Sequence, residues 1–205
     1  MARAIVESIA FVAWAVPCFI LVEAVVPRAR ARIRWPAIAL ATAMLVVNSV
    51  VARGLGYLTP VTGAASTARI LVAWFATELA AYWLHRAMHR VPLLWRVHRM
   101  HHTDVPLAWH QSWWIHPVDI ALFAITAACV TWLVGAPMTA APWFLLVRRA
   151  WGILLHANVR WPATWLDHVI VTPAVHHRHH REDLPPANFA GSFAFFDRAF
   201  GTWRR

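Results

Sequence analysis

Long apolar runs, separated by short segments that carry Arg, restrict the possible folds of this chain more than any other feature. The first run is Ile5–Val26 and the second is Pro36–Val51. A helix needs about 20 predominantly apolar residues to cross a bilayer, so each run approaches the length of one span. Apolar residues make up 60% of the chain and charged residues 14%, against roughly half and a quarter in soluble domains. These features predict an integral membrane protein.

An Arg-rich loop between the first two runs predicts the orientation of the chain, because clustered Arg beside a span is typical of the cytoplasmic side. The loop carries Arg28, Arg30, Arg32 and Arg34. Three further runs follow, at Ala68–Leu84, Val118–Val134 and Pro142–Leu155. We therefore predict an all-α integral membrane bundle of about four to five transmembrane or membrane-embedded helices. The polar segments His85–His116 and His156–Arg205 would form a helical cap in the cytoplasm.

The whole of residues 1–205 is predicted to be a single membrane domain. Residues 1–67 form an N-terminal transmembrane pair, and residues 68–205 hold the other runs and the histidine clusters. Glu7 and Glu23, with no clear small-residue cleavage site before Pro27, indicate that the first run is retained rather than cleaved as a signal peptide. Arg148 and Arg149 lie in the fifth run, so that helix must be short, shielded or turned toward a polar site.

The formal net charge of +10 includes no Lys. Because the Arg residues flank apolar runs, this charge favours contact with anionic lipid headgroups over binding of nucleic acid. Exclusive use of Arg in an Ala-rich chain is typical of bacterial genomes of high GC content, which indicates the bacterial inner membrane.

Three histidine clusters carry the chemistry of this sequence. Histidines three or four residues apart share one face of a helix, and neutral imidazole binds Zn, Cu, Fe and Ni. The predicted topology places all three clusters on the same side of the membrane, and eight histidines exceed the needs of one ion. The pattern therefore predicts a pair of metal ions. The clusters are His85-x3-His89, His98-x2-His101-His102 and His176-x2-His179-His180.

These clusters and the segments between them resemble the fatty acid hydroxylase/sterol desaturase superfamily. HRAMH, HRMHH and HHRHH are similar to its three histidine boxes, WWIHPVD to its His-Pro-acidic segment and LLHANVRWP to its His-Ala-Asn stretch. The closing NFAGSFAFFDRAFGTW resembles the family's ending, with Phe196 where Trp is usual. The resemblance extends from about Thr77 to the C-terminus, while the first two runs match only in character.

The resemblance implies a membrane-bound non-haem di-iron centre that uses O2 to hydroxylate or desaturate C–H bonds of a fatty acyl, sterol-like or isoprenoid lipid. Zinc can replace iron in such proteins after purification. Electrons would come from an external donor, either a cytochrome b5-like protein, a ferredoxin or a reductase. The implied metal ligands are His85, His89, His98, His101, His102, His156, His176, His179 and His180.

The sequence leaves a tenth ligand open, because Gly152 stands where some members have a histidine. His116 is a candidate for that ligand, or for a residue that orients one. Asp119 and Asn158 are candidates for the same supporting role, since carboxylates and amides hydrogen-bond metal-bound imidazoles. Asp104 and Asp167 are better explained as helix caps or solvated loop residues. His177 lies beside ligands but off their register, on the opposite side of the helix.

One alternative is a membrane protein that binds metal without catalysis, such as a metal buffer or a transporter component. Another is a zinc hydrolase, but the sequence has no H-E-x-x-H motif. The sequence also contains no Gly-rich dinucleotide motif and no set of Cys for an iron–sulfur cluster. The reductant must therefore dock from the cytoplasm. A basic face is available for it at Arg86, Arg90, Arg96, Arg99 and Arg181, and a solvated, lipid-facing role explains these Arg residues equally well.

Overall fold

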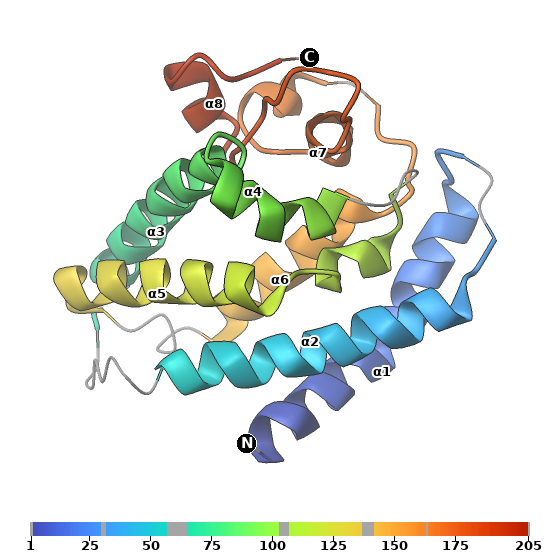
Figure 1. Cartoon of the computed structure of the whole chain (residues 1–205), viewed down its shortest axis with the longest axis horizontal. Helices are drawn as coiled ribbons and strands as arrows, with labels where there is room; N and C mark the ends of the chain where they lie inside the picture. The colour runs from blue at the N-terminus through green and yellow to red at the C-terminus, as the bar shows by residue number, and fades with distance from the viewer. Residues whose placement is uncertain are drawn as a thin grey trace.

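The structure is a computed structural model that describes residues 2–29, 32–56, 65–102, 107–136, 142–162 and 164–204. Within these ranges the regular elements are helices, which confirms the predicted all-α class (Figure 1). The long helices are α1 (Ala2–Val25), α2 (Trp35–Gly56), α3 (Thr67–Met88), α5 (Pro117–Val134) and α6 (Pro142–His156). The short helices are α4 (Pro92–His98), α7 (Pro173–His179) and α8 (Phe195–Ala199), with 3-10 turns η1 (Arg99–His102), η2 (Trp109–Trp113) and η4 (Trp165–His168).

Three helices in the described part of the chain are long and apolar enough to cross a membrane, over Ile5–Val25, Trp35–Leu55 and Pro117–Val134. Their apolar side chains face outward; Trp132 and Leu133 of α5 are 65% and 74% exposed. Such a surface suits lipid, because soluble monomers rarely expose large contiguous apolar patches. The finding supports an integral membrane protein. Neither α3, which contains Arg69 and Glu78, nor the shorter α6 is among these three helices.

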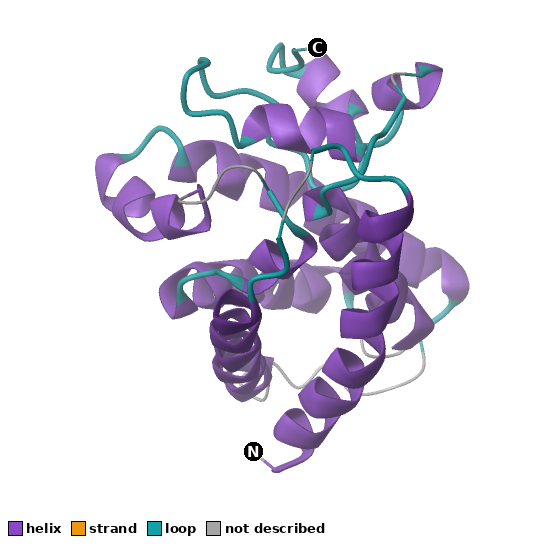
Figure 2. Cartoon of the chain, turned by 90° about the vertical axis from the view of Figure 1, so that its right-hand side faces the viewer, coloured by secondary structure: helices purple, strands orange, loops and turns teal. Residues whose placement is uncertain are grey.

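The short helices α7 and α8 lie together at the end of the molecule opposite the N-terminus, with α4 crossing beneath them (Figure 1). The view from the side shows the same arrangement of long helices below and short helices with loops above (Figure 2). Two apolar cores hold these parts together. One joins α1, α2, η2 and α6 around Phe11, Trp109 and Ile153. The other joins α3, α6 and the C-terminal segment around Tyr82 and Phe189.

The end of α1 is fastened to the segment that follows α6. Glu23 accepts hydrogen bonds from the backbone N–H groups of Trp109 (2.9 Å) and Asn158 (2.7 Å). The Asn158 side chain in turn accepts from the Ala29 N–H and donates to the Ala29 carbonyl. A short antiparallel bridge between Pro27 and Val159 continues this contact. The N-terminal helices are therefore tied directly to the part of the chain that carries the histidines.

Arg148 in α6 is paired, as the cost of a charge in lipid requires. Its Nε lies 2.7 Å from Oε1 of Glu78 in α3, and Glu78 is only 1% exposed. Arg149 contacts Ser49 of α2 and stacks over Phe11 of α1. Both Arg residues therefore have partners on neighbouring helices, although each is itself exposed. Of the alternatives that the sequence left open, the structure shows the short helix, which has 15 residues. Most of the connector expected outside the membrane, residues 57–64, falls outside the described residues.

The ion pair between Arg148 and the buried carboxylate of Glu78 leads to a first prediction. Glu78→Gln should lower the free energy of unfolding by about 1–3 kcal/mol, because Arg148 would lose the partner that compensates its charge. Thermal unfolding in detergent measures the change. Glu7→Gln is the matched control, since Glu7 pairs with Arg53 at an exposed position and such pairs contribute about 0–1 kcal/mol. Equal shifts for the two variants would contradict a stabilising role specific to the Glu78–Arg148 pair.

Candidate metal centre

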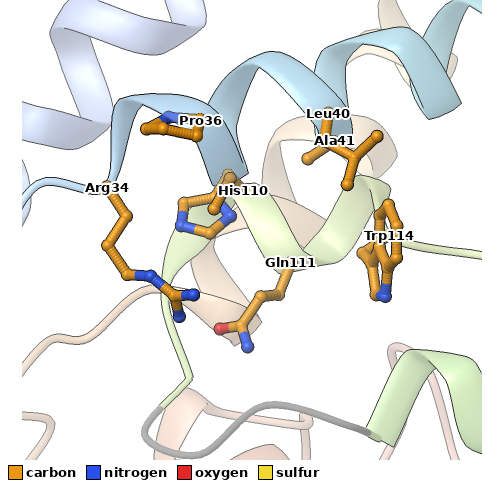
Figure 3. A pocket seen from close by; sticks show the side chains of 8 residues that line it. Arg34, Pro36, Leu40, Ala41, His110, Gln111 and Trp114 are labelled. Carbon is orange, nitrogen blue, oxygen red and sulfur yellow. The ribbon is translucent and has the colours of Figure 1, made fainter.

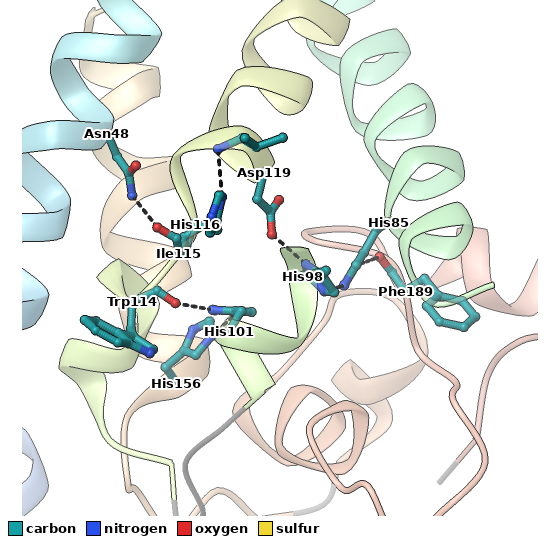
Figure 4. Close-up of polar contacts among 11 residues, drawn as sticks. Asn48, His85, His98, His101, Trp114, Ile115, His116, Asp119, His156 and Phe189 are labelled. Atoms are coloured by element: carbon teal, nitrogen blue, oxygen red, sulfur yellow. Dashed lines mark hydrogen bonds and ion pairs between the residues drawn. The ribbon is translucent and has the colours of Figure 1, made fainter. Parts of the chain in front are cut away.

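Nine histidines from distant parts of the chain come together in two groups. Within each group, one ring nitrogen of every histidine lies within 4.8 Å of the others. The five-histidine group consists of His85, His89, His98, His102 and His179. The four-histidine group consists of His101, His156, His176 and His180. In Figure 4, His85 and His98 face each other in the first group, and His101 and His156 in the second. These are the nine positions that the family resemblance implies as ligands.

Two of the sequence clusters divide between the groups. His98 and His102 enter the five-histidine group, whereas His101 turns to the four-histidine group. In the last cluster His176 and His180 enter the four-histidine group, and His179 turns to the other. Residues four apart lie above one another on a helix, so in each of these two clusters the His-x3-His pair belongs to one group. The remaining ligand of the cluster, His101 or His179, belongs to the other group. The two groups are thereby built into one unit, and the rings of His102 and His180 stack between them at 4.3 Å.

The groups form where four helices end. His85 lies in the last turn of α3, His98 in that of α4 and His156 in that of α6. His176 and His179 lie in the last turn of α7, and His180 is its C-cap residue. The C-terminal end of a helix carries a partial negative charge that stabilises a nearby cation. Several such ends converge here, so the backbone itself favours positive charge between the rings.

Five of the nine rings are held in place through Nδ1. Imidazoles that bind metal usually donate their other ring N–H to a carboxylate or a carbonyl, which fixes the ring and its tautomer. Here one acceptor is the buried carboxylate of Asp119, and the other four are backbone carbonyls. Figure 4 shows Asp119 and the carbonyls of Phe189 and Trp114. The pairs are His98–Asp119 (2.7 Å), His85–Phe189 (2.7 Å), His179–Ala187 (2.8 Å), His156–Gly152 (2.8 Å) and His101–Trp114 (3.3 Å).

With their Nδ1 protons donated outward, these rings turn Nε2 lone pairs toward one another. The Nε2 atoms of His101 and His156 are 3.0 Å apart, although both then act as acceptors. The Nε2 atoms of His89, His102 and His179 are buried without a hydrogen-bond partner among the described residues. Buried polar atoms almost always have a hydrogen-bond partner. A cation in each group would bind these Nε2 atoms in place of hydrogen bonds.

The spacing also matches shared coordination. Two nitrogens about 2.1 Å from one ion and at right angles are about 3.0 Å apart, whereas tetrahedral nitrogens are about 3.4 Å apart. The neighbouring Nε2 atoms of His85–His98, His156–His176 and His176–His180 are each 3.1 Å apart. The residues present therefore fit a metal ion in each group, with angles closer to octahedral than to tetrahedral.

Burial keeps these imidazoles neutral. It lowers the pKa of His89 to about 3, with a further contribution from the charge of His98. It lowers the pKa of His156 to about 4 and holds the pKa of His101 and His180 well below the ordinary value. Metal binding requires the deprotonated ring nitrogen, so these rings are ready to act as ligands at neutral pH.

The C-terminal segment supplies two of the carbonyls that orient ligands. Its residues 187–190 are held by the buried carboxylate of Asp197, which accepts from the N–H groups of Phe189 (2.7 Å) and Ala190 (3.0 Å) and from the Thr202 hydroxyl (2.8 Å). Asn188 adopts a φ of 59°, which Asn tolerates better than most residues. This conformation lets neighbouring carbonyls reach His85 and His179.

Tyr82 and Asn188 extend the hydrogen-bond network around Asp197. Tyr82 shares a hydrogen bond with Thr202 (2.8 Å) and accepts one from Arg86 (3.1 Å). The Asn188 side chain bonds to the backbone N–H and carbonyl of Arg204, both at 2.8 Å. The closing motif is thus a support for the five-histidine group. From the sequence, Asp197 is a candidate for support of the site, with helix capping or surface pairing as the alternatives, and its contacts favour the supporting role.

Several other candidates have different contacts. The His116 ring is outside both groups and caps α5 by accepting from the Val118 N–H at 3.1 Å (Figure 4). The Asn158 side chain contacts Ala29 rather than an imidazole. The His177 Nε2 lies 3.0 Å from the Ala157 carbonyl, in keeping with its position off the register of its neighbours. Asp167 caps η4 and accepts from Thr172. Asp104 falls outside the described residues.

Two cavities lie near the groups. One of about 710 Å³ is lined by His102 and His180, one member of each group, and by charged residues that include Arg28 and Arg181. A second, of about 360 Å³, lies between α2 and η2, where Arg34, His110 and Gln111 line it (Figure 3). His110 is buried here, 7% exposed, rather than lying at the membrane interface. The first cavity gives polar molecules access to the centre.

The family model described as fatty acid hydroxylase matches residues 70–202. Those residues include every member of both histidine groups and the Asp197 network. No solved structure is significantly similar to the chain.

Relatives with curated descriptions are similar over about two thirds of this chain. Ornithine lipid hydroxylase OlsE of Rhizobium tropici is 29% identical over 66% of this chain and 41% of its own length. A Delta(7)-sterol 5(6)-desaturase of Gibberella zeae is 27% identical over 62% of this chain and 39% of its own. Human alkylglycerol monooxygenase is 27% identical over 64% of this chain and 29% of its own length. The chain therefore spans less than half the length of these relatives.

The two groups lead to a prediction about metal content. His101→Ala should remove metal from the four-histidine group, because it deletes an Nε2 that faces another ligand, while the helices still assemble. His177→Ala is the control, since that ring contacts a carbonyl outside both groups. Elemental analysis of purified protein measures metal per chain. Full metal in the His101 variant, or its loss from the His177 variant, would contradict the assignment.

The carboxylate of Asp119 supports a separate prediction. Asp119→Asn keeps an acceptor for the His98 Nδ1 proton but removes the negative charge that makes the ring more basic. Metal affinity should fall about 10–100-fold, as for other partners of metal-bound imidazoles. Competition with a chelator measures it. Asp183→Asn, at an exposed ion pair with Arg181, should leave the affinity unchanged.

Proposed function

This chain belongs to the fatty acid hydroxylase family, and from that premise we propose that it is a membrane-bound oxygenase of lipids. It would hydroxylate or desaturate a C–H bond with O2 and electrons from an external donor. The observation that carries this proposal is the pair of histidine groups, in which nine imidazoles, seven of them buried and two half-buried, converge on two neighbouring spaces.

The five-histidine and four-histidine groups would each hold one iron ion, with zinc as the substitute that purified protein can carry. Bound iron supplies the activation of O2 and the removal of hydrogen from an unreactive C–H bond. The protein positions the ions through Asp119 and the carbonyls of residues 187–189. Neutral imidazoles suit Fe, Zn, Cu and Ni alike, so the choice of iron rests on the family.

The electrons of the reaction balance with one external donor. O2 takes up four electrons, of which two come from the donor and two from the substrate. In hydroxylation, one oxygen atom enters the C–H bond as a hydroxyl and the other leaves as water with two protons from solvent. In desaturation, the substrate loses two hydrogens and both oxygens leave as water.

A lipid is the substrate class that agrees with the surroundings of the site. The groups lie at the ends of helices that include α3 and α6, which expose apolar side chains such as Leu71, Phe75 and Val147, so a substrate dissolved in the bilayer would reach the centre along them. The printed names of the relatives include an ornithine lipid hydroxylase, a sterol desaturase and an alkylglycerol monooxygenase. A fatty acyl, sterol-like or isoprenoid chain satisfies the same requirement.

The electron donor would dock on the cap. Arg90, Arg96 and Arg99 are exposed there, close in sequence to His89, His98 and His101. A cytochrome b5-like protein or a ferredoxin with an acidic surface would complement this charge. The Arg-rich loop after α1 supports a cytoplasmic cap, and the composition supports a bacterial inner membrane.

The alternative of a metal buffer or transporter component makes different predictions. Transport requires ionisable residues along a path through the spans, whereas Glu78 and Arg148 are paired with each other. A buffer would bind metal without consuming O2. The oxygenase proposal therefore differs from both in its use of O2.

A test of the proposal begins with protein produced with iron supplied and reconstituted with lipids from the producing cells. We expect a pair of irons per chain, O2 uptake on chemical reduction, and a lipid that gains one oxygen atom or loses two hydrogens in mass spectrometry. The His101→Ala protein is the matched control and should do none of these. Bound zinc alone from iron-supplied cultures, with no O2 uptake on reduction, would contradict the oxygenase and favour the alternative.

A further inference from the structure

The two histidine groups differ by one ligand. The five-histidine group contains two pairs of histidines four residues apart, His85–His89 and His98–His102, and one single ring, His179. The four-histidine group contains one such pair, His176–His180, and the single rings His101 and His156. A histidine four residues before His156 would give the second group the same composition as the first. That position is Gly152.

Gly152 lies on the same face of α6 as His156, because residues four apart are stacked on a helix. The flanks of this face are fixed by packing on both sides. Ile153 and Ala157 enter the core with α1 and η2, and Trp151 and Leu155 enter the core with α3 and the C-terminal segment. The face between these flanks turns toward α2 and α3, since Arg148 reaches Glu78.

The space beside Gly152 is open. A Cβ atom at this position would meet no heavy atom within 4 Å, although the neighbouring positions on α6 are packed. Its carbonyl accepts the Nδ1 proton of His156 at 2.8 Å, so the backbone of this turn supports the ligand while its side-chain position stays empty. The vacancy therefore lies one helical turn from the His156 ring, on the side of the long helices.

We propose that Gly152 leaves one coordination position of the ion in the four-histidine group free for a small exogenous ligand, anionic or diatomic, where the five-histidine group has one more imidazole. This inference rests on the proposed function for the presence of the two ions. It gives the two ions different tasks, because only one of them has a position that opens on the side of Gly152.

Azide is the probe for this position, and cobalt is the metal, because its visible absorption reports changes of ligand. Cobalt-loaded wild-type protein should show a saturable change with azide. Gly152→Ala, the matched control, adds only a Cβ in open space and should respond in the same way. Gly152→His should bind azide at least about tenfold more weakly, a difference of about 1.4 kcal/mol, with cobalt content unchanged. Equal azide affinity in the Gly152→His protein, or no response in fully loaded wild type, would overturn the inference.

A second substitution covers the case in which the Gly152→His protein does not fold. Gly152→Leu fills the open space with a side chain that has no ligand atom, and it should weaken azide binding to the cobalt-loaded protein at least about tenfold. Gly54→Leu, on α2 with equally open space, should leave the azide affinity unchanged. Wild-type azide affinity in the Gly152→Leu protein would also overturn the inference. Wild-type protein that takes up neither cobalt nor iron would instead contradict the metal pair, and with it the proposed function.

Discussion

The convergence of neutral imidazoles on two small spaces is the interaction on which the rest of this structure depends. Nitrogen lone pairs 3.0–3.1 Å apart repel one another unless positive charge lies between them. Four helix ends direct their partial negative charge to the same place. The protein is therefore organised around cations, and a chain without them would hold these rings together at a cost. This explains why the long helices, the cap and the C-terminal segment all contribute to one centre.

The C-terminal segment has a purpose in this arrangement that its residue types do not reveal. Asp197 contacts no imidazole, yet it fixes the N–H groups of Phe189 and Ala190. The Phe189 carbonyl, which shares a peptide with the Ala190 N–H, then holds the Nδ1 atom of His85, and the Ala187 carbonyl two residues earlier holds that of His179. A buried carboxylate two steps from the metal site thus determines the direction of two ligands.

The sequence predicted the helical class, three of the apolar spans and the eight clustered histidines, because each depends on residue type and spacing. The ninth histidine, His156, followed only from the resemblance to the family. It did not predict how the histidines divide, since the rotation of His101 and His179 away from their neighbours depends on where α4 and α7 end. Backbone carbonyls such as those of Ala187 and Phe189 have no signature in residue type. The capping role of His116 and the contact of Asn158 with Ala29 also arise from packing between distant segments.

The same dependence on context explains where the polar groups sit relative to the membrane. The apolar helices can present Leu and Trp to lipid only if their polar residues are satisfied inside the bundle. Glu78 meets this condition by pairing with Arg148, and the Asn48 amide N–H meets it by donating to the Ile115 carbonyl (Figure 4). Imidazoles in such numbers cannot pair with one another, because all of them are acceptors toward the centre. They lie at the helix ends, where carbonyls and Asp119 accept hydrogen bonds from their Nδ1–H groups. Polar molecules can reach them there through the cavity beside His102 and His180.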